Sequence, residues 1–276
     1  MSLRVPAGTI YGLVGPNGAG KTTLLSILAG TRRPQAGSVE ISVPRQRVAV
    51  CPDVPEFDGW LTAFEVVDLA RAYVAPDLDG EAVLDALRTA GLDHAADHKV
   101  GGFSRGMTQR LGLATTLVGQ PELIILDEPT SALDPAGRVE ILSLVAGLRG
   151  RATVVFSSHI LADVQRVADH VSVLRAGRVL YEGPIQTLID EHLQPRWRIR
   201  LASDREGVVR ALQSEDWVAR VATGPDEVVV ETTSLEAGQR LLPGVLASVG
   251  ARLVSIEPVD ADLEAAFLAL TGEERA

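Results

Sequence analysis

The strongest constraint on the fold lies near the start of the chain, where Gly15–Thr22 reads GPNGAGKT. The apolar run Ile10–Val14 precedes this stretch, and the helix-forming run Thr22–Ala29 follows it. Glycine tolerates backbone conformations that a Cβ forbids, so a tight loop is expected between a buried strand and a helix. The chain must therefore fold around a strand, a glycine-rich loop and a helix, in that order.

The same stretch fits the pattern G-x-x-x-x-G-K-[ST], which predicts a loop that binds phosphate. Its backbone N–H groups and the positive end of the next helix would face the anion. Lys21 is expected to reach phosphate oxygens, and Thr22 to ligate a Mg²⁺ that bridges them. The predicted nucleotide-binding residues are Gly15, Pro16, Asn17, Gly18, Ala19, Gly20, Lys21, Thr22 and Thr23. A glycine-rich turn that binds nothing is the alternative.

Charge and cysteine content narrow the functional classes. A net charge of −10 gives no long-range attraction to nucleic acid or to an anionic lipid surface, so neither is an expected partner. The single cysteine, Cys51, excludes an internal disulfide and fits a reducing compartment. No signal peptide is recognisable, and no apolar run approaches the roughly eighteen residues that span a bilayer. We expect a cytoplasmic protein that reaches a membrane only through another polypeptide.

Strand-like and helix-like segments alternate through residue 194, which predicts an α/β domain with a mainly parallel core sheet. After the first helix, strands are expected around Ser38–Ser42 and Arg47–Cys51. Residues from about 55 to 120 carry apolar side chains at helical spacing and are expected to form a helical insertion. Residues 195–276 form strand and helix patterns of their own, which predicts a small C-terminal α+β domain.

Two adjacent carboxylates, Asp127 and Glu128, end the apolar run Leu123–Leu126. Neighbouring side chains at a strand end point to different sides, so the two acids are free to act differently. Asp127 is suited to hold Mg²⁺, and Glu128 to accept a proton from an attacking water. A purely structural strand could end with the same letters. The phosphate loop upstream favours the functional interpretation.

Further segments carry a family resemblance. Phe103–Arg110, with Ser104 and Gly106 at the matching positions, resembles the LSGGQ signature motif of ATP-binding cassette (ABC) ATPases. Ser131–Asp134 resembles the D-loop of that family, and His159 follows the strand VVFSS where the family has its switch histidine. A histidine at a strand end is more often structural, but its place in this ordered series favours a catalytic role. The resemblance covers residues 3–193.

The resemblance implies a P-loop NTPase fold, ATP and Mg²⁺ as cofactors, and catalytic roles for Glu128, His159 and Lys21. In this family two cassettes pair head to tail, here as an expected homodimer. Ser104 and Gly106 would then contact ATP bound to the partner subunit, and Asp134 would lie at the dimer interface. The second implied partner is an integral-membrane permease, which would hold the chain at the cytoplasmic face of the plasma membrane.

Two departures from the family pattern stand out. Asp53 takes the place of a glutamine that senses Mg²⁺, and since carboxylate oxygen is a good Mg²⁺ ligand, Asp53 is a further candidate metal ligand. Related cassettes also carry a first strand and an adenine-stacking aromatic residue ahead of the segment that Met1–Val5 resembles. We expect both to be missing here because the recorded start is internal to the gene.

Three functions compete: the energising subunit of an exporter, a soluble ABC ATPase outside transport, and a nucleotide-binding regulator. Glu128 and His159 argue against the regulator, which needs neither a base nor its partner. The stretch Asp262–Gly272 resembles the tail of cassettes that serve drug, lipid or polysaccharide exporters of the type-2 class. We therefore expect an exporter subunit. For the C-terminal domain itself, a packing or dimerisation unit without a ligand is the alternative.

Overall fold

The computed structural model of the chain describes residues 1–131, 133–192, 195–202, 205–224, 227–259 and 263–271. It divides into two compact units, Met1–Ile185 and Gln186–Ala276. The domain boundary expected at residue 194, and Ala132 of the expected D-loop, lie outside the described residues. Within the described part of the chain, no helix combines the length and the apolar character needed to cross a membrane.

The first unit is built on a six-stranded sheet in the order β2-β3-β4-β1-β5-β6. Its strands are β1 Ile10–Val14, β2 Val48–Cys51, β3 Leu123–Leu126, β4 Thr153–Ser158, β5 His170–Arg175 and β6 Arg178–Pro184. The first five run parallel to their neighbours, and β6 alone is antiparallel, in a hairpin with β5. The mainly parallel α/β fold predicted from the sequence is confirmed.

The parallel register brings the carboxyl ends of four strands to one edge of this sheet. Cys51 of β2 pairs with Leu126 of β3, Leu126 pairs with Phe156 of β4, and Val14 of β1 pairs with Ser158 of β4. Ligands of open parallel sheets bind beyond the carboxyl ends of the strands. Because β4 lies between β3 and β1, residues at its end have neighbours from both strands.

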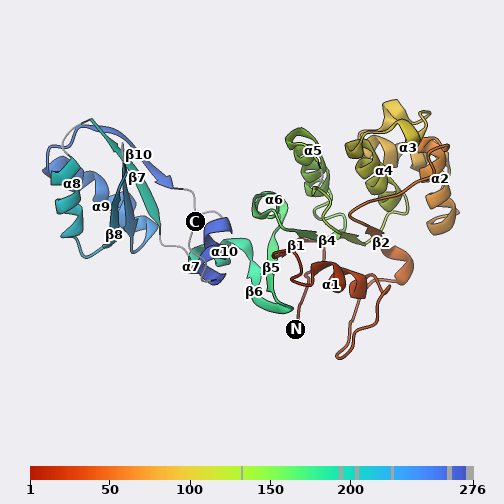
Figure 1. The fold of residues 1–276 in the computed structure, drawn as a ribbon, viewed down its shortest axis with the longest axis horizontal. Helices are drawn as coiled ribbons and strands as arrows, with labels where there is room; N and C mark the ends of the chain where they lie inside the picture. Colours follow the sequence, from red (N-terminus) through yellow and green to blue (C-terminus); the bar gives the residue numbers. More distant parts are fainter. Residues whose placement is uncertain (132, 193–194, 203–204, 225–226, 260–262, 272–276) are drawn as a thin grey trace. The chain divides into compact units, whose positions relative to one another are not determined.

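Helices cover both faces of the sheet (Figure 1). Tyr11 and Leu13 of β1 are fully buried against Leu25 of α1 (Lys21–Leu28), whereas Gly12, between them, faces Val164 of α6 (Leu161–Val167). Figure 1 shows α5 (Pro135–Ala146) on the same side as α6. Alternation along a buried strand thus places α1 on one face and α6 on the other.

The three longest helices between β2 and β3 pack around a core of their own (Figure 1). They are α2 Ala63–Val74, α3 Gly80–Thr89 and α4 Arg105–Leu117, and short 3₁₀ turns lie among them at Asp93–Ala95 and Val100–Gly102. A further 3₁₀ turn, Arg45–Arg47, precedes β2. Val67, Leu87 and Leu111 contribute fully buried side chains from the three helices. Thr62 and Glu65 form a reciprocal capping box that fixes the start of α2. These helices fall within the range expected for the helical insertion.

The prediction of a strand around Ser38–Ser42 is wrong. This segment is irregular and mostly exposed, and it pairs with no strand in the described part of the chain. A strand needs a hydrogen-bonded neighbour to satisfy its backbone, so β-forming residues alone do not produce one.

The second unit contains a four-stranded antiparallel sheet in the order β10-β7-β9-β8. Its elements are β7 Arg196–Leu201, α8 Arg205–Gln213, β8 Val218–Thr223, β9 Glu227–Thr232, α9 Leu235–Ser248 and β10 Leu253–Val259. This is the βαββαβ chain order of ferredoxin-like units. The short helices α7 Ile185–His192 and α10 Leu263–Thr271 lie before and after it in the sequence.

One face of this sheet is buried under α8 and α9. Trp197 and Ile199 of β7 pack in one hydrophobic cluster with Leu212 of α8 and Leu242 of α9. Arg198 lies between Trp197 and Ile199 in sequence and therefore points to the opposite face. The unit thus has one apolar face and one charged face.

Candidate functional site

The glycine-rich loop between β1 and α1 adopts a conformation that other residues would resist. Gly18 and Gly20 have φ angles of +82° and +103°, in the left-handed region that favours glycine. A Cβ on Gly15 would lie 2.3 Å from the backbone oxygen of Leu174, closer than any real contact. The carbonyl of Pro16 accepts a hydrogen bond from the N–H of Ala19 at 3.1 Å and closes the turn.

Residues 17–23 of this loop line a cavity of about 440 Å³ together with Asp53, Glu128, Ser131 and His159. The volume lies in the range of small-molecule sites. N–H groups in the first turn of a helix have no carbonyl partner within the helix, and the helix dipole is positive there. The cavity is therefore suited to an anionic ligand.

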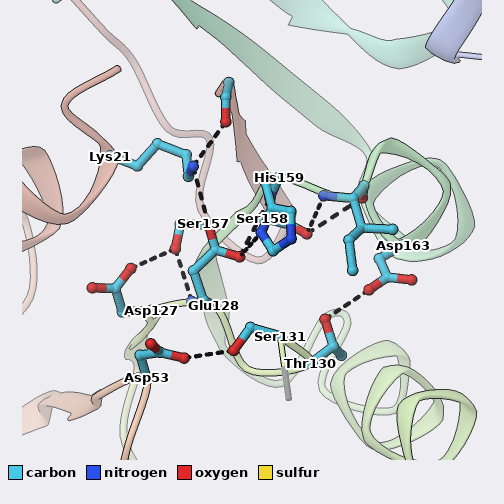
Figure 2. Close-up of polar contacts among 12 residues, drawn as sticks. Lys21, Asp53, Asp127, Glu128, Thr130, Ser131, Ser157, Ser158, His159 and Asp163 are labelled. Carbon is cyan, nitrogen blue, oxygen red and sulfur yellow. Dashed lines mark hydrogen bonds and ion pairs between the residues drawn. The ribbon is translucent and has the colours of Figure 1, made fainter. Parts of the chain in front are cut away.

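Lys21 is the buried cation of this cavity, with a side chain only 6% exposed. Its Nζ donates a 2.8 Å hydrogen bond to the carbonyl of Gly15 and lies 3.1 Å from Glu128 Oε1 (Figure 2). Burying an ammonium group is costly without such partners. A carboxylate thus neutralises the lysine, and phosphate oxygens would compete with that carboxylate.

The two acids that end β3 point to different partners (Figure 2). Asp127 Oδ1 accepts hydrogen bonds from Thr22 Oγ1 at 3.3 Å and from Ser157 Oγ at 2.6 Å. The Glu128 carboxylate is 13% exposed and lies against Lys21 and His159. Glu128 has a φ angle of +46°, which is uncommon for a residue with a Cβ and turns the chain sharply after Asp127.

His159 extends from the end of β4 over Glu128. Its Nδ1 lies 2.8 Å from Glu128 Oε2, and its backbone N–H donates to the same oxygen at 3.3 Å. The histidine side chain is 42% exposed, so it lies at the mouth of the cavity. The arrangement fixes the direction of the Glu128 carboxylate, which a general base requires.

Asp53 follows β2 and lines the cavity from another side. Its Oδ1 accepts a 2.7 Å hydrogen bond from Ser131 Oγ, so the residues after β2 and β3 are joined. Cys51, two residues earlier, is buried, and this burial raises the pKa of its thiol to about 12 despite an opposing hydrogen bond with Thr116. The thiol is therefore protonated and unreactive at neutral pH.

The expected dimer-interface residues do not line this cavity. Ser104 caps α4 through a 3.3 Å hydrogen bond from the N–H of Met107, and Gly106 lies in the first turn of that helix. Asp134 caps α5 by accepting from the N–H of Gly137 at 3.0 Å. The structure therefore brings together the loop, Asp53, Asp127, Glu128 and His159. The three expected interface residues lie elsewhere, at the starts of α4 and α5.

Two residues at the site were not predicted to lie there, although Ser131 belongs to the segment that resembles the D-loop. Ser131 lines the cavity, and the side chain of Ser157 contacts both acids after β3. Ser157 precedes His159 by two positions, so it shares that residue's side of the strand. The available signal was a polar residue at that spacing, directly after the apolar residues VVF of the strand.

Oxygen donors at the loop fit a magnesium ion. The Thr22 hydroxyl and the Asp127 carboxylate are hard ligands 3.3 Å apart, beside a loop suited to phosphate. Mg²⁺ in proteins is commonly held by one or two carboxylates together with phosphate oxygens. The donor set therefore agrees with a metal bound jointly with a nucleotide.

Comparisons with known proteins agree with this site. The family model described as "ABC transporter" matches residues 1–131. An uncharacterised ABC transporter ATP-binding protein of Bacillus subtilis is 34% identical over 249 residues, covering 88% of this chain and 83% of the relative. A Nod factor export ATP-binding protein of a Rhizobium species is 31% identical and covers 99% of this chain and 91% of its own length.

Solved structures lead to the same family. A dimeric ATP-binding cassette in a post-hydrolysis state, bound to ADP and phosphate, is 26% identical with a TM-score of 0.60. The match covers 66% of this chain and 88% of that cassette.

Proposed function

The chain belongs to the ATP-binding proteins of ABC transporters, and from this membership we propose that it powers an exporter through a separate membrane permease. It has the P-loop NTPase fold and is an ATP-binding, ATP-hydrolysing subunit. The observation that carries the proposal is the meeting of Lys21, Glu128 and His159 at one cavity. Asp127 is bonded to Thr22 of the cavity lining. The nearly full-length similarity to a Nod factor export protein supports transport outward.

The loop amides and Lys21 would neutralise charge on the phosphates of ATP. Phosphoryl transfer depends mainly on positioning and on such neutralisation, since little covalent chemistry is left to the protein. Mg²⁺, held by Thr22 and Asp127, would supply further positive charge. Lys21 now divides its contacts between Gly15 and Glu128, so phosphate oxygens can replace the Glu128 contact.

Glu128 would accept the proton of the attacking water. Its carboxylate lines the cavity, and His159 holds one of its oxygens through the ring and the backbone. A base must be held in a fixed direction to accept a proton efficiently. His159 therefore acts on catalysis by orienting Glu128.

A second copy of the chain would complete the site. Ser104 and Gly106 lie at the start of α4 and do not line the cavity of their own chain. A helix start is a favourable place for phosphate, so these residues suit ATP held by a partner cassette. Asp134, at the start of α5, would lie at the same interface. The dimeric state of the related solved cassette supports this pairing.

The permease is proposed to dock in a groove of about 780 Å³ between the helical insertion and the sheet. Glu81, Ala82 and Asp85 of α3 line one side, and Arg47 and Arg151, at the amino ends of β2 and β4, line the other. A permease segment bearing both signs of charge could pair with each side. Since the permease segment would touch both the helical insertion and the sheet, it would respond to a movement of one relative to the other. This docking would hold the chain at the cytoplasmic face of the membrane.

Replacing the base tests hydrolysis. Glu128→Gln should reduce ATP turnover by about 100-fold or more, because the carboxylate that accepts the proton is gone. ATP binding should persist, since the loop and Thr22 are intact, and ATP should trap a dimer detectable by light scattering. Glu122→Gln is the matched control, because Glu122 is exposed and directly precedes the first residue of β3, at the end of the strand opposite Glu128. Turnover of Glu128→Gln at the unmodified rate would contradict the assignment.

Filling the groove tests the docking site. Ala82→Arg should lower co-purification of a co-expressed partner permease by roughly tenfold, because a long side chain would occupy the groove. Leu84→Arg places the same charge on α3 at an exposed position that does not line the groove. ATP turnover of the isolated variants should stay unchanged. Equal permease recovery with Ala82→Arg and Leu84→Arg would rule out this groove.

A further inference from the structure

The end of β4 holds both acids after β3, and Ser157 supplies two of the contacts (Figure 2). Its Oγ donates to Asp127 Oδ1 at 2.6 Å and accepts from the backbone N–H of Glu128 at 2.8 Å. We infer that Ser157 is a positioning residue whose one hydroxyl sets the metal ligand and the general base together. The inference rests on the proposed ATPase site and adds a residue to it.

The hydroxyl acts once as a donor and once as an acceptor in these two contacts. Ser157 is completely buried, so an unmade hydrogen bond there would not be replaced by water. The Glu128 N–H can only donate, which leaves the hydroxyl proton of Ser157 for the Asp127 carboxylate. A hydroxyl bonded to a carboxylate at this length is a charge-assisted contact and is stronger than a neutral one.

For Asp127, the contact fixes the carboxylate beside Thr22. The same oxygen, Oδ1, accepts from both Ser157 and Thr22. Groups that orient a metal ligand without touching the metal commonly matter for affinity, because they hold the ligand in its binding direction. Ser157 is therefore expected to influence the Mg²⁺ requirement of nucleotide binding.

For Glu128, the contact stabilises an unusual backbone. A φ angle of +46° is disfavoured for a residue with a Cβ, so the surrounding structure must hold it. The 2.8 Å bond to Ser157 supports the backbone on one side, and His159 holds the side chain on the other. Without the hydrogen bond to Ser157, the Glu128 carboxylate would be held less firmly in one orientation.

The position of Ser157 makes this support rigid. β4 lies between β3 and β1, and Ser157 pairs in register with Leu13 of the buried strand β1. Ser157 and His159 are two residues apart and share one side of the strand. The end of β4 thus orients Glu128 twice: Ser157 holds the Glu128 backbone, and His159 holds the Glu128 carboxylate.

A serine that only satisfies local hydrogen bonds would affect stability alone. A positioning residue would also alter the metal requirement and the turnover rate while leaving metal-free nucleotide binding intact. Ser158 is the matched comparison, because it is equally buried but bonds only to the backbone of Ile160 among the described contacts.

The test compares Ser157→Ala with Ser158→Ala in the full chain. Binding of a fluorescent ATP analogue is measured in EDTA and then across a Mg²⁺ titration, and kcat and the melting temperature are measured in parallel. Ser157→Ala should raise the Mg²⁺ concentration for half-maximal nucleotide binding, and lower kcat, each by about 10- to 100-fold. Its binding in EDTA should match the unmodified chain. Ser158→Ala should keep the Mg²⁺ requirement and kcat.

If Ser157→Ala does not fold, Ser157→Cys fills the site with a slightly larger group that is only a weak donor, and it should shift both quantities in the same direction. A folded Ser157 variant with an unchanged Mg²⁺ requirement and kcat would overturn the inference, as would equal losses in Ser158→Ala. Failure of the proposed function is distinguishable, because the unmodified chain would then neither bind nor hydrolyse ATP.

Discussion

The two units use polar residues on their sheets in opposite ways. In the first unit, β3 is apolar from Leu123 to Leu126, and the acids come only after it ends. In the second unit, arginines alternate with buried residues along β7, at Arg196, Arg198 and Arg200. Polar groups at the end of a buried strand can converge on a ligand, whereas polar groups along a strand line a face.

The difference follows from how each sheet is covered. A parallel sheet with helices on both faces excludes charged side chains from its interior, so the charged groups lie at the strand ends. An antiparallel sheet covered on one face leaves the other for charge pairs, here Arg196 with Glu231 at 2.7 Å and Arg198 with Glu227 at 3.0 Å. Partly exposed pairs of this kind contribute little stability. Position relative to the strand end therefore separates functional charge from solvated charge.

The largest expected effect comes from removing the buried cation of the first unit. Lys21→Ala should weaken ATP binding by about 3 kcal/mol, on the order of 100-fold, because it removes a charged phosphate contact and leaves Glu128 buried without that cation. Isothermal titration with ATP and Mg²⁺ measures it. Lys99→Ala removes an exposed lysine from the helical insertion and should leave the affinity unchanged. If Lys21→Ala bound ATP with unaltered affinity, the charged groups at the strand ends of the first unit would not differ in function from the solvated charges of the second unit.

A smaller effect is expected in the core of the second unit. Gly238 of α9 packs on Trp197, and a Cβ there would lie 2.0 Å from Trp197 Nε1. Gly238→Ala should therefore destabilise this unit by about 2 kcal/mol through overpacking, as measured by urea unfolding followed by tryptophan fluorescence. The KM for ATP should not change.

Gly244→Ala is the control for this substitution. It adds the same methyl group to the same helix, at a position where the new Cβ would meet no atom within 4 Å apart from its chain neighbours and the backbone of its own helix. Helix propensity alone should then stabilise the unit by up to about 1 kcal/mol. A changed KM in Gly238→Ala would show that the second unit influences the nucleotide site.

The parts of the fold that were predicted depend on local patterns. The phosphate loop and the apolar run before Asp127 can be recognised from the sequence because each is continuous. β8 is difficult to recognise from the sequence because VARVAT combines small and charged residues without strong alternation, and its strand conformation depends on pairing with β9. Ser38–Ser42 was wrongly assigned for the converse reason, since no described strand pairs with it.

The site was predictable in its individual residues and less so in its connections. Sequence order indicated Glu128 and His159 separately, but the contact of Ser157 with both acids depends on the register between β3 and β4. The left-handed backbone of Glu128 is likewise set by its neighbours rather than by its identity. Hydrogen bonds between segments distant in sequence are the features that required the structure.

Cys51 has a practical consequence for studying motion. It is the single cysteine of the chain, and its thiol is buried and protonated at neutral pH. A maleimide dye should therefore react only with cysteines introduced at chosen surface positions. One label in each unit would report by energy transfer whether nucleotide changes the separation between them, with the natural thiol left in place.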